Sequence, residues 1–558
     1  MGKGKWAFKD LLCLGVILLV SLLASLPLFK AEIVQFNDSF CAMVKTVGLA
    51  MVWQDGQVAG RWLPDINYGY GYPLLNFYPP LFSYLTAIAS LIVNNYMVGT
   101  NIILILGFIG SGFAMYLFAR DFWGRQGALL SAVAYVFAPF HLCDIYQRSA
   151  DAQFLSFVFL PLSAWGFYRL WVDTRFAYFV WAALAFAGLI ISHNAIALFF
   201  FPVMVAYVVF QYVIDSPKSW MKIIWSGGAM TCAFALTAYY WLPALAEKQY
   251  VMINKITQGN WDFHVHMMSL YQLLFAAWTY AHWGMGYGHS FQIGIGHLFL
   301  TVIALAVIPI LWRADKKTSW HMFFWVVVGV ACGFMMLKAS AFVWESLPLV
   351  KYVAAPWRLI VLIAFVLSFL SGAIVLWKPG RASAWIVPCA IALILALNFS
   401  YAKPNATYAL DLASPRAFLG SHWPMDNMEY LPRWVQKIPM APPPARYLVM
   451  QGQAIISAPQ KISGVHHAFT VNATTPAIVC FHHFYFPGWK VFIDGQETAI
   501  HPENPYGLIV FAVPPGVHDI RITFGHTPVR VAGELISWLT VLCLLGGGFF
   551  LGWRRRKI

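Results

Sequence analysis

Charged residues are scarce in this chain of 558 residues. Asp, Glu, Lys and Arg together make up 10% of the sequence, whereas 60% of it is hydrophobic and 17% is aromatic. In a soluble domain, roughly a quarter of all residues are charged. The composition therefore excludes an ordinary soluble enzyme and predicts an integral membrane protein.

Several familiar motifs are also missing. The sequence contains no GxxxxGK[ST] phosphate loop, no HExxH and no GxSxG, which argues against ATP hydrolysis and metalloprotease activity. Most of the 8 cysteines lie inside apolar runs and show no spacing typical of a disulfide framework or a zinc site. We therefore expect neither a disulfide nor a structural metal.

The formal net charge of +14 does not indicate a nucleic-acid partner. The basic residues fall largely in short clusters between apolar segments, where Lys and Arg act as orientation signals for membrane insertion. We therefore expect no binding of nucleic acid.

Apolar segments long enough for a bilayer recur along the chain. A spanning helix needs about 20 such residues, and we expect about twelve spans, over residues 10–29, 95–118, 126–143, 152–172, 176–192, 195–213, 221–243, 294–312, 319–337, 357–377, 383–400 and 529–552. Residues 79–94 are shorter. If they form a re-entrant or interfacial helix, the basic clusters all share the side of the basic N-terminus. Both termini are then cytoplasmic.

This topology predicts three domains or modules. Residues 1–400 form a membrane module with external loops at 30–94 and 244–293, the first of which contains interfacial helices. Residues 401–528 form an external β-rich domain, because the runs 485–495, 507–516 and 517–524 are β-branched or aromatic and end in Gly or Pro turns. Residues 529–558 form a final transmembrane helix and a basic cytoplasmic tail.

Ionisable groups gather where the expected spans emerge on the outer side. Such groups are costly in a bilayer and usually have a function, so we expect a site at this surface, with candidates Asp38, Arg61, Asp144, Arg148, Asp151, His193 and Arg358. The external arginines run against the positive-inside trend. They could bind a phosphate, contact headgroups or pair with a carboxylate, as Arg61 could with Asp65.

Other candidates keep two interpretations each. Asp144 and Asp151 are seven residues apart and could share one helical face, where they would hold a cation or be solvated. His193 could bind a phosphate or hydroxyl, or cap a tight helical hairpin. Tyr70 and Tyr78, in a stretch rich in Gly, Tyr and Pro, could stack on sugar rings or anchor the loop at the headgroups.

Several motifs resemble known membrane families. Asp38 after the first span, YPPLFSYL, LFARDFWGR and APFHLCDIYQRSADAQ resemble the GT-C membrane glycosyltransferases, which use lipid-linked sugar donors. More narrowly, GRWLPDINYGYGYPLLNFYPPL, YQRSAD, ISHNAIA, APWRL and EYLPRW resemble the bacterial integral membrane family labelled 6-pyruvoyl-tetrahydropterin synthase related. The run PGWKVFIDG resembles the terminal β domain of related bacterial glycosyltransferases. The fold implied is an all-α GT-C-like bundle with a C-terminal β-rich domain.

The resemblance implies roles for particular residues. Asp38 would be the general base of an inverting glycosyl transfer. Arg148, Arg358 and Arg61 would bind the phosphate of a polyprenyl-phosphate sugar donor, and Asp144, Asp151, His193, Tyr70 and Tyr78 are candidates for binding substrate or metal. Asp38 and Asp151 would hold a divalent cation, Mg²⁺ or Mn²⁺.

The implied setting is a bacterial inner membrane with the active site on the periplasmic face. The partners would be membrane lipid, the donor and an envelope acceptor, which is a lipid, a glycan or a protein. The alternative from another class is a non-catalytic transporter or assembly factor for cell-envelope glycans, in which the same polar groups bind without reacting.

Overall fold

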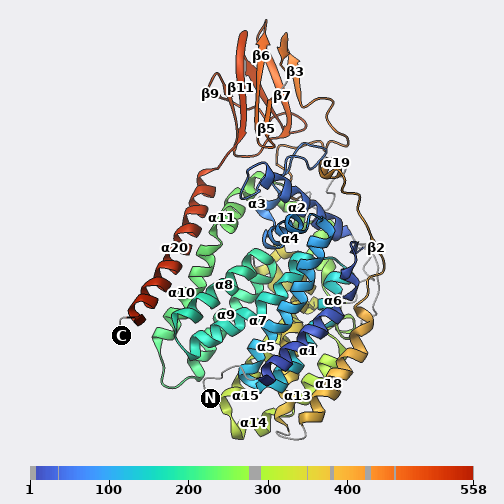
Figure 1. The fold of residues 1–558 in the computed structure, drawn as a ribbon, viewed down its shortest axis with the longest axis vertical. Helices are drawn as coiled ribbons and strands as arrows, with labels where there is room; N and C mark the ends of the chain where they lie inside the picture. Colours follow the sequence, from blue (N-terminus) through green and yellow to red (C-terminus); the bar gives the residue numbers. More distant parts are fainter. Residues whose placement is uncertain are drawn as a thin grey trace.

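A bundle of helices carries a β-sheet region at one end (Figure 1). The computed structural model describes residues 8–34, 37–275, 291–347, 350–377, 383–420, 429–457 and 460–556. The α-helices are α1 (Phe8–Ala24), α2 (Asn37–Gln54), α3 (Leu74–Phe77), α4 (Leu81–Val93), α5 (Tyr96–Val136), α6 (Pro139–Tyr146), α7 (Asp151–Val172), α8 (Phe176–Ser192), α9 (Asn194–Ile214), α10 (Trp220–Leu236), α11 (Ala238–Glu247), α12 (Leu270–Phe275), α13 (Ile295–Leu305), α14 (Ile308–Ala314), α15 (Lys316–Met336), α16 (Ala341–Ser346), α17 (Ile360–Ser371), α18 (Ser383–Asn398), α19 (Pro415–Gly420) and α20 (Pro528–Arg556).

Within the described residues, seven helical segments are long and apolar enough to cross a membrane, or eight if the bent pair α10 and α11 is one span. The seven are Tyr96–Tyr146, Asp151–Val172, Asn194–Ile214, Ile295–Arg313, Lys316–Met336, Pro356–Leu376 and Pro528–Phe549. The expected count of twelve spans stays a prediction, since several shorter apolar helices, α8 among them, fall below that length.

One long segment is a helical hairpin. In α5, Gly124 has φ +67°, a left-handed conformation that glycine adopts without strain. The rings of Phe108 and His141 lie 5.0 Å apart, and Gly112 packs against Val136, so the chain folds back at Gly124. The expected spans 95–118 and 126–143 are therefore the two arms of this hairpin.

Helix α4 covers the segment expected to be re-entrant or interfacial. Its 13 residues are shorter than the bilayer requires, and Asn94 ends it in the left-handed conformation that often terminates helices. In Figure 1 it lies beside α2 at the end of the bundle that faces the β-sheets.

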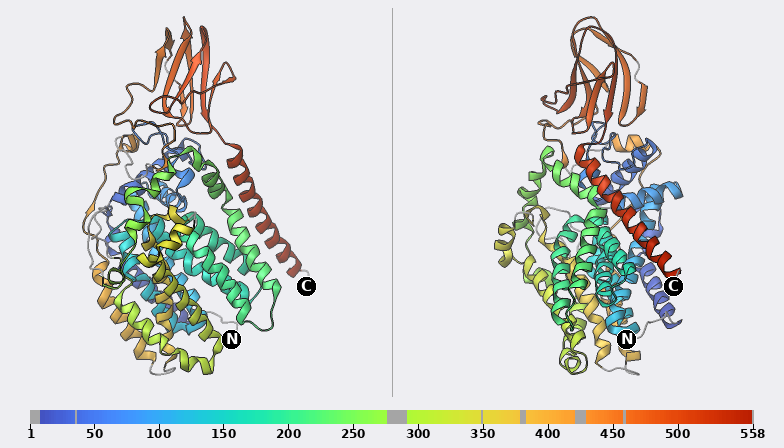
Figure 2. Two further views of the ribbon diagram at one scale, coloured as in Figure 1. Left: turned by 180° about the vertical axis from the view of Figure 1, so that it is seen from behind. Right: turned by 90° about the vertical axis from the view of Figure 1, so that its left-hand side faces the viewer.

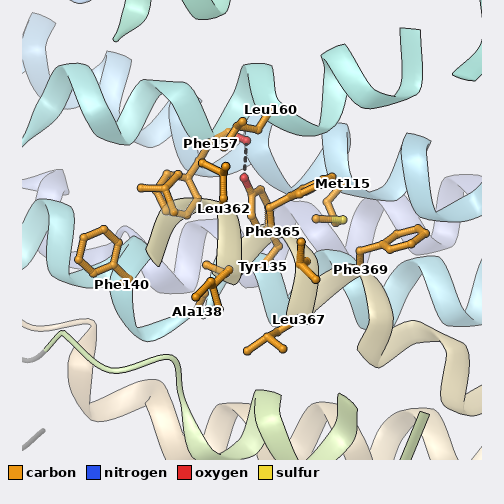
Figure 3. Close-up of a cluster of buried hydrophobic side chains, with 14 of the residues drawn as sticks. Met115, Tyr135, Ala138, Phe140, Phe157, Leu160, Leu362, Phe365, Leu367 and Phe369 are labelled. Carbon is orange, nitrogen blue, oxygen red and sulfur yellow. Dashed lines mark hydrogen bonds between the residues drawn. The ribbon is translucent and has the colours of Figure 1, made fainter. Parts of the chain in front are cut away.

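The centre of the bundle is α17, all of whose residues are buried. Leu362, Phe365 and Phe369 of this helix pack against side chains of α5 and α7 (Figure 3). The hydroxyl of Tyr135 donates to the carbonyl of Phe157 at 3.0 Å, so this buried polar atom has a partner. Aromatic packing of this kind gives the bundle a closely packed centre next to the segment that precedes α17.

The β-sheet region expected near the C-terminus is present. The strands are β1 (Ile33–Val34), β2 (Thr407–Tyr408), β3 (Tyr447–Gln451), β4 (Ala454–Ile456), β5 (Gln460–Ser463), β6 (His466–Ala473), β7 (Ala477–Phe484), β8 (Trp489–Ile493), β9 (Gln496–Thr498), β10 (Leu508–Val513) and β11 (Gly516–Phe524). One sheet has the order β10-β7-β3, and the other has the order β4-β6-β11-β8-β9 with β5 beside β6. Pairs are antiparallel, and alternate residues of β6 point inward, as the period of a strand requires.

The β-sheet core continues into residues 30–94, the segment predicted to be the first external loop. Val479 and Phe511 of the sheets share one buried cluster with Trp62 and Tyr72 of the loop, and the amide of Phe484 donates to the carbonyl of Tyr70 at 2.8 Å. The two regions therefore pack as one body. From the sheets, α20 runs back along the outside of the bundle beside α11 and α10 (Figures 1 and 2).

A buried polar network joins these parts. Glu247, at the end of α11, accepts from Arg530 Nη2 at 2.9 Å and from Asn76 Nδ2 at 2.8 Å. Arg61 donates to Asn76 Oδ1 at 3.2 Å and forms an ion pair with Glu534 at 3.1 Å. Arg530 also donates to the carbonyl oxygen of Pro487, at 2.8 Å. The network thus connects the first loop, α11, α20 and the β-sheets.

Loss of Glu247 should destabilise the whole assembly. Glu247→Ala leaves the buried guanidinium of Arg530 unpaired, and we expect a loss of about 3–5 kcal/mol of folding free energy. The measurement is denaturant unfolding of the detergent-solubilised protein. The control, Glu503→Ala, removes an exposed carboxylate and should change stability by less than about 1 kcal/mol. Equal losses in the two variants would contradict the role of the network.

Candidate functional site

A cavity of about 580 Å³ lies at the end of the bundle next to the β-sheets. This volume is within the usual range for small-molecule sites. Its walls come from α2, the start of α7, the α8–α9 turn, α11 and the segment before α17. Residues far apart in the sequence, such as Asp38, Arg148, His193 and Arg358, therefore line a single space.

Several helices direct their N-termini into this cavity. Helix α2 begins at Asn37, α7 at Asp151 and α9 at Asn194, and residues of the first turn of each line the walls. The free backbone amides of a helix N-terminus give it a partial positive charge that favours anions. The arrangement therefore stabilises carboxylates and would also stabilise a bound phosphate.

Asp38 lies in the first turn of α2 and faces the cavity. The hydroxyl of the next residue, Ser39, bonds to the hydroxyl of Ser149 at 2.6 Å and donates to the carbonyl of Val34 at 2.6 Å. Because Ser149 follows Arg148 in the chain, this contact fixes Asp38 next to the segment that carries the arginine.

Asp144 and Asp151 do not share a helical face. Helix α6 ends at Tyr146, Ser149 adopts φ +53°, and a new helix starts at Asp151. Asp151 lines the cavity, whereas Asp144 is fully buried beneath it. The two carboxylates could share a face only on one continuous helix, and the left-handed residue Ser149 interrupts the helix between them.

Asp144 holds Arg148 in place. Its carboxylate accepts from Arg148 Nη1 at 2.5 Å and from Gln153 Nε2 at 3.0 Å. The guanidinium of Arg148 lies 4.3 Å from the ring centre of Trp357, a cation–π contact that adds to the ion pair. Asp144 thus positions the arginine, and its carboxylate is already occupied.

Arg358 lies in the 3-10 turn Pro356–Leu359 that precedes α17. Its Nη1 donates to the carbonyl of Val353 at 2.6 Å. Its Nε, like that of Arg148, is buried with no hydrogen-bond partner among the residues that the structure describes. Both arginines also line the cavity, so their guanidinium groups are placed to meet a ligand there.

His193 caps a helix and also lies in the cavity lining, where its role as a ligand for phosphate or hydroxyl stays a prediction. Its Nδ1 accepts from the amide of Ile196 at 3.2 Å and caps α9, while the residue also lines the cavity. Burial and the charges of Arg358 and Arg148 hold the pKa of His193 well below its usual value. The ring is therefore neutral at pH 7 and, with Nδ1 accepting, its proton is on Nε2.

Part of the cavity lining is apolar. It is built by side chains of α8, α9, α10 and α11, namely Ile190, Ala197, Leu198, Phe201, Phe234, Trp241, Ala244 and Leu245. Leu198 and Leu245 are exposed. The lining therefore combines charged groups with a continuous set of apolar side chains.

Two expected site residues lie elsewhere. Arg61 is outside the cavity, where it pairs with Glu534 and not with Asp65. Tyr70 stacks on Phe484 of β7 with ring centres 5.4 Å apart. Both residues join the first loop to later parts of the chain, so the structure does not support their roles as substrate ligands. Tyr78 does line the cavity.

The sequence interpretation missed Lys45, Gln153, Glu429 and Tyr430, which are at or in the cavity wall. Lys45 had a usable signal, because it is the only basic residue between Lys30 and Arg61 in a segment expected to be external. For Glu429 and Tyr430, the sequence shows no signal of a site other than their place in the motif EYLPRW.

A divalent cation finds a limited set of ligands here. Asp38 and Asp151 both line the cavity, but no group of three or more His, Cys, Asp or Glu side chains converges among the described residues. Mg²⁺ and Mn²⁺ prefer octahedral oxygen sites, and a lysine ammonium shares the same wall. The residues present fit such a cation poorly.

The apolar helical bundle and the cavity at one end of it define a polytopic membrane protein with a candidate binding site. The chain belongs to the 6-pyruvoyl-tetrahydropterin synthase related family of membrane proteins, whose model matches residues 75–407. The family expected from the motifs is therefore confirmed.

Other similarities are more distant. An uncharacterized protein of Lactococcus lactis subsp. cremoris (strain MG1363) is 25% identical over 255 residues, which are 44% of this chain and 41% of that protein. The chain thus matches about four tenths of the length of this curated relative.

Two solved structures resemble the fold in part. The arabinofuranosyltransferase AftD from Mycobacteria has a TM-score of 0.48 at 13% identity, over 73% of this chain and 28% of that one. The Archaeoglobus fulgidus oligosaccharyltransferase in its apo form has a TM-score of 0.46 at 12% identity, over 70% of this chain and 55% of that one. Likeness at this level does not define a function, so the function has to be argued from the cavity itself.

Substitution of His193 tests its double role. His193→Leu removes the cap of α9 and should cost about 1 kcal/mol of stability, whereas His193→Asn keeps a capping oxygen and should cost little. The measurement is denaturant unfolding in detergent. Equal stability of the two variants would argue against the cap.

The lowered pKa of His193 adds a pH dependence. The unfolded histidine titrates near about 6.5, so protonation favours the unfolded chain and the contribution of neutral His193 is lost as pH falls below that value. Relative to His193→Asn, whose side chain does not titrate, the stability of wild type should therefore fall between about pH 7 and about pH 5. A stability difference that is constant over this interval would contradict the lowered pKa.

Proposed function

We propose that this protein is a glycosyltransferase that moves a sugar from a polyprenyl-phosphate donor to an acceptor on the outer face of a bacterial inner membrane. The observation that carries the proposal is the mixed lining of the cavity. It has guanidinium groups and helix N-termini around a carboxylate, and it also has a large apolar part with the exposed side chains Leu198 and Leu245. A lipid phosphate has the same two-part chemistry.

The charged side suits the phosphate. Arg148 and Arg358 each have a buried Nε without a partner among the described residues, and guanidinium groups bind phosphate oxygens through paired hydrogen bonds. Asp144 and Trp357 hold Arg148 in a fixed position. A preorganised ligand loses little freedom on binding, so the arginine can stabilise the charge that develops on the leaving phosphate.

The apolar wall suits the prenyl chain. Each methylene group that moves from water into such a wall contributes roughly 0.8 kcal/mol. Leu198 and Leu245 line the cavity and are exposed, so we propose that a prenyl chain lies against them and extends from there into the bilayer. Both termini on the cytoplasmic side would leave the cavity facing the periplasm, which agrees with its place next to the external β-sheets.

The reaction we propose is a direct displacement. Asp38 removes the proton of an acceptor hydroxyl as that oxygen attacks the anomeric carbon of the sugar. The bond from that carbon to the phosphate oxygen breaks, and polyprenyl phosphate leaves with the electron pair, held by Arg148 and Arg358. Attack opposite to the leaving group inverts the configuration. The neutral Nε2–H of His193 can donate to a substrate oxygen. The acceptor is an envelope lipid, glycan or protein.

Asp38→Asn tests the reaction. The amide cannot accept the proton, so transfer of radiolabelled sugar from a panel of polyprenyl-phosphate donors to an envelope extract should fall by about 10²–10⁴-fold. The matched control, Asp411→Asn, changes an exposed external carboxylate and should transfer sugar at the wild-type rate. Unchanged transfer by Asp38→Asn would remove Asp38 from the reaction. Donor binding by wild type without any transfer would favour a transporter or assembly factor.

Arg358 variants test the phosphate contact separately. Arg358→Gln removes a charge-assisted contact worth about 1.5–3 kcal/mol, so affinity for the donor should fall about 10-fold or more. Arg358→Lys keeps the charge but loses the paired geometry and should lie between wild type and Arg358→Gln. Donor binding in nanodiscs is the measurement. Wild-type affinity in Arg358→Gln would place the phosphate elsewhere.

A further inference from the structure

Lys45 is a buried cation that the reaction described above does not use. It lies on α2 two turns after Asp38, so both side chains project from the same side of the helix and line the cavity. Lys45 is 6% exposed. A lysine this buried is rare unless it is paired, because desolvation of the ammonium is costly.

No carboxylate within the described residues lies within 4.0 Å of the Lys45 ammonium. What the ammonium does contact is the ring of Tyr78, whose centre is 3.7 Å away. A cation–π contact contributes at most about 2 kcal/mol or slightly more when desolvated, which does not replace the hydration of a full charge. The geometry leaves this cation with room for an anionic ligand.

The ammonium remains charged in this position. Burial by itself lowers the pKa of Lys45, but the interactions of the ammonium with Tyr78, which include a hydrogen bond to its hydroxyl, and with Cys41 outweigh burial and raise the pKa above its usual value. Asp151 contributes in the same direction. Lys45 is therefore a permanent positive charge at neutral pH.

Lys45 belongs to the same charged region as the arginines. Tyr78, which the ammonium contacts, also interacts electrostatically with Arg358, and Arg358 interacts with Arg148. All three cations line one cavity. They come from three separate parts of the chain, namely α2, the α6–α7 turn and the segment before α17.

We infer that Lys45 is the third cationic ligand of the donor phosphate, and that it supplies from within the chain the positive charge that a divalent metal ion would otherwise supply. The inference rests on the proposed function for the identity of the ligand. It also states that phosphate binding at this cavity is independent of metal, and that Lys45 repels a metal ion from Asp38 and Asp151.

A metal-binding measurement tests, without any substrate, whether Lys45 repels a metal ion from Asp38 and Asp151. Mn²⁺ is titrated into the full-length protein and free Mn²⁺ is followed by electron paramagnetic resonance. Lys45→Met removes the repelling charge, so its affinity for Mn²⁺ should exceed that of wild type by about fivefold or more. Lys45→Arg and the exposed control Lys437→Met should behave as wild type does. Tight binding of one Mn²⁺ by wild type that is lost in Asp151→Asn would overturn the inference.

A lipid-binding measurement tests whether Lys45 contributes to phosphate binding and whether that binding is independent of metal. Binding of polyprenyl phosphate to protein in nanodiscs should be the same, within about twofold, in EDTA and in excess Mg²⁺. Lys45→Met should weaken it about tenfold or more, as loss of a charged contact predicts, and Lys45→Arg should retain most of it. Wild-type binding that EDTA abolishes and Mg²⁺ restores would overturn the inference but leave the proposed function intact. Failure of wild type to bind in either condition would refute the proposed function, while the Mn²⁺ titration still decides whether Lys45 excludes metal.

Discussion

The buried pair of Glu247 and Arg530 is the interaction on which the arrangement of this protein depends. Both residues are at most 2% exposed, and their hydrogen bonds reach Asn76 of the first loop and Pro487 of the β-sheet region. Burial of two charges is costly, so such a pair gives little net stability over an apolar core but strongly penalises any structure that separates the partners. Here it selects one position of α20 and the sheets relative to the cavity wall.

This constraint has a consequence for the site. Glu247 ends α11, the helix that contributes Trp241 and Leu245 to the apolar wall, and Lys248 of the cavity follows directly. Asn76 precedes Phe77 and Tyr78, which line the other side. The network therefore sets the distance between the two sides of the cavity. In a site that binds a lipid phosphate, that distance has to match the distance between the phosphate group and the apolar chain of the lipid.

The charged side gains strength from its surroundings. Coulombic interactions weaken in proportion to the dielectric constant, so cations that are removed from water act on a phosphate far more strongly than they would at an open surface. The rigid aromatic packing around α17 supports Trp357 and Arg358 from below. Fixed donors need no rearrangement when charge develops, which is the main electrostatic contribution of an enzyme to catalysis.

Much of the fold could be predicted, because bilayer insertion is a local property. Hydropathy over about 20 residues reports spanning helices, and Gly and Pro turns between β-branched runs report strands. The helical hairpin at Gly124 and the strands β8, β10 and β11 lie where these local patterns indicate. Asp38, Arg148, His193 and Arg358 were recognisable for a related reason, since a charged or titratable group at the end of an apolar span stands out.

The sequence by itself determined that this chain enters a membrane, that it ends in β-sheets and a last helix, and that chemistry gathers at one set of helix ends. Only the tertiary structure decided which of those polar groups meet. Arg61 looked like a phosphate ligand until its partner proved to be Glu534, 473 residues further along, and Lys45, which the sequence interpretation missed, proved to be buried in the cavity lining. The physical reason is that hydropathy and helix termini are set by neighbours in the chain, whereas the partner of a charge is set by packing between segments that the local sequence does not relate.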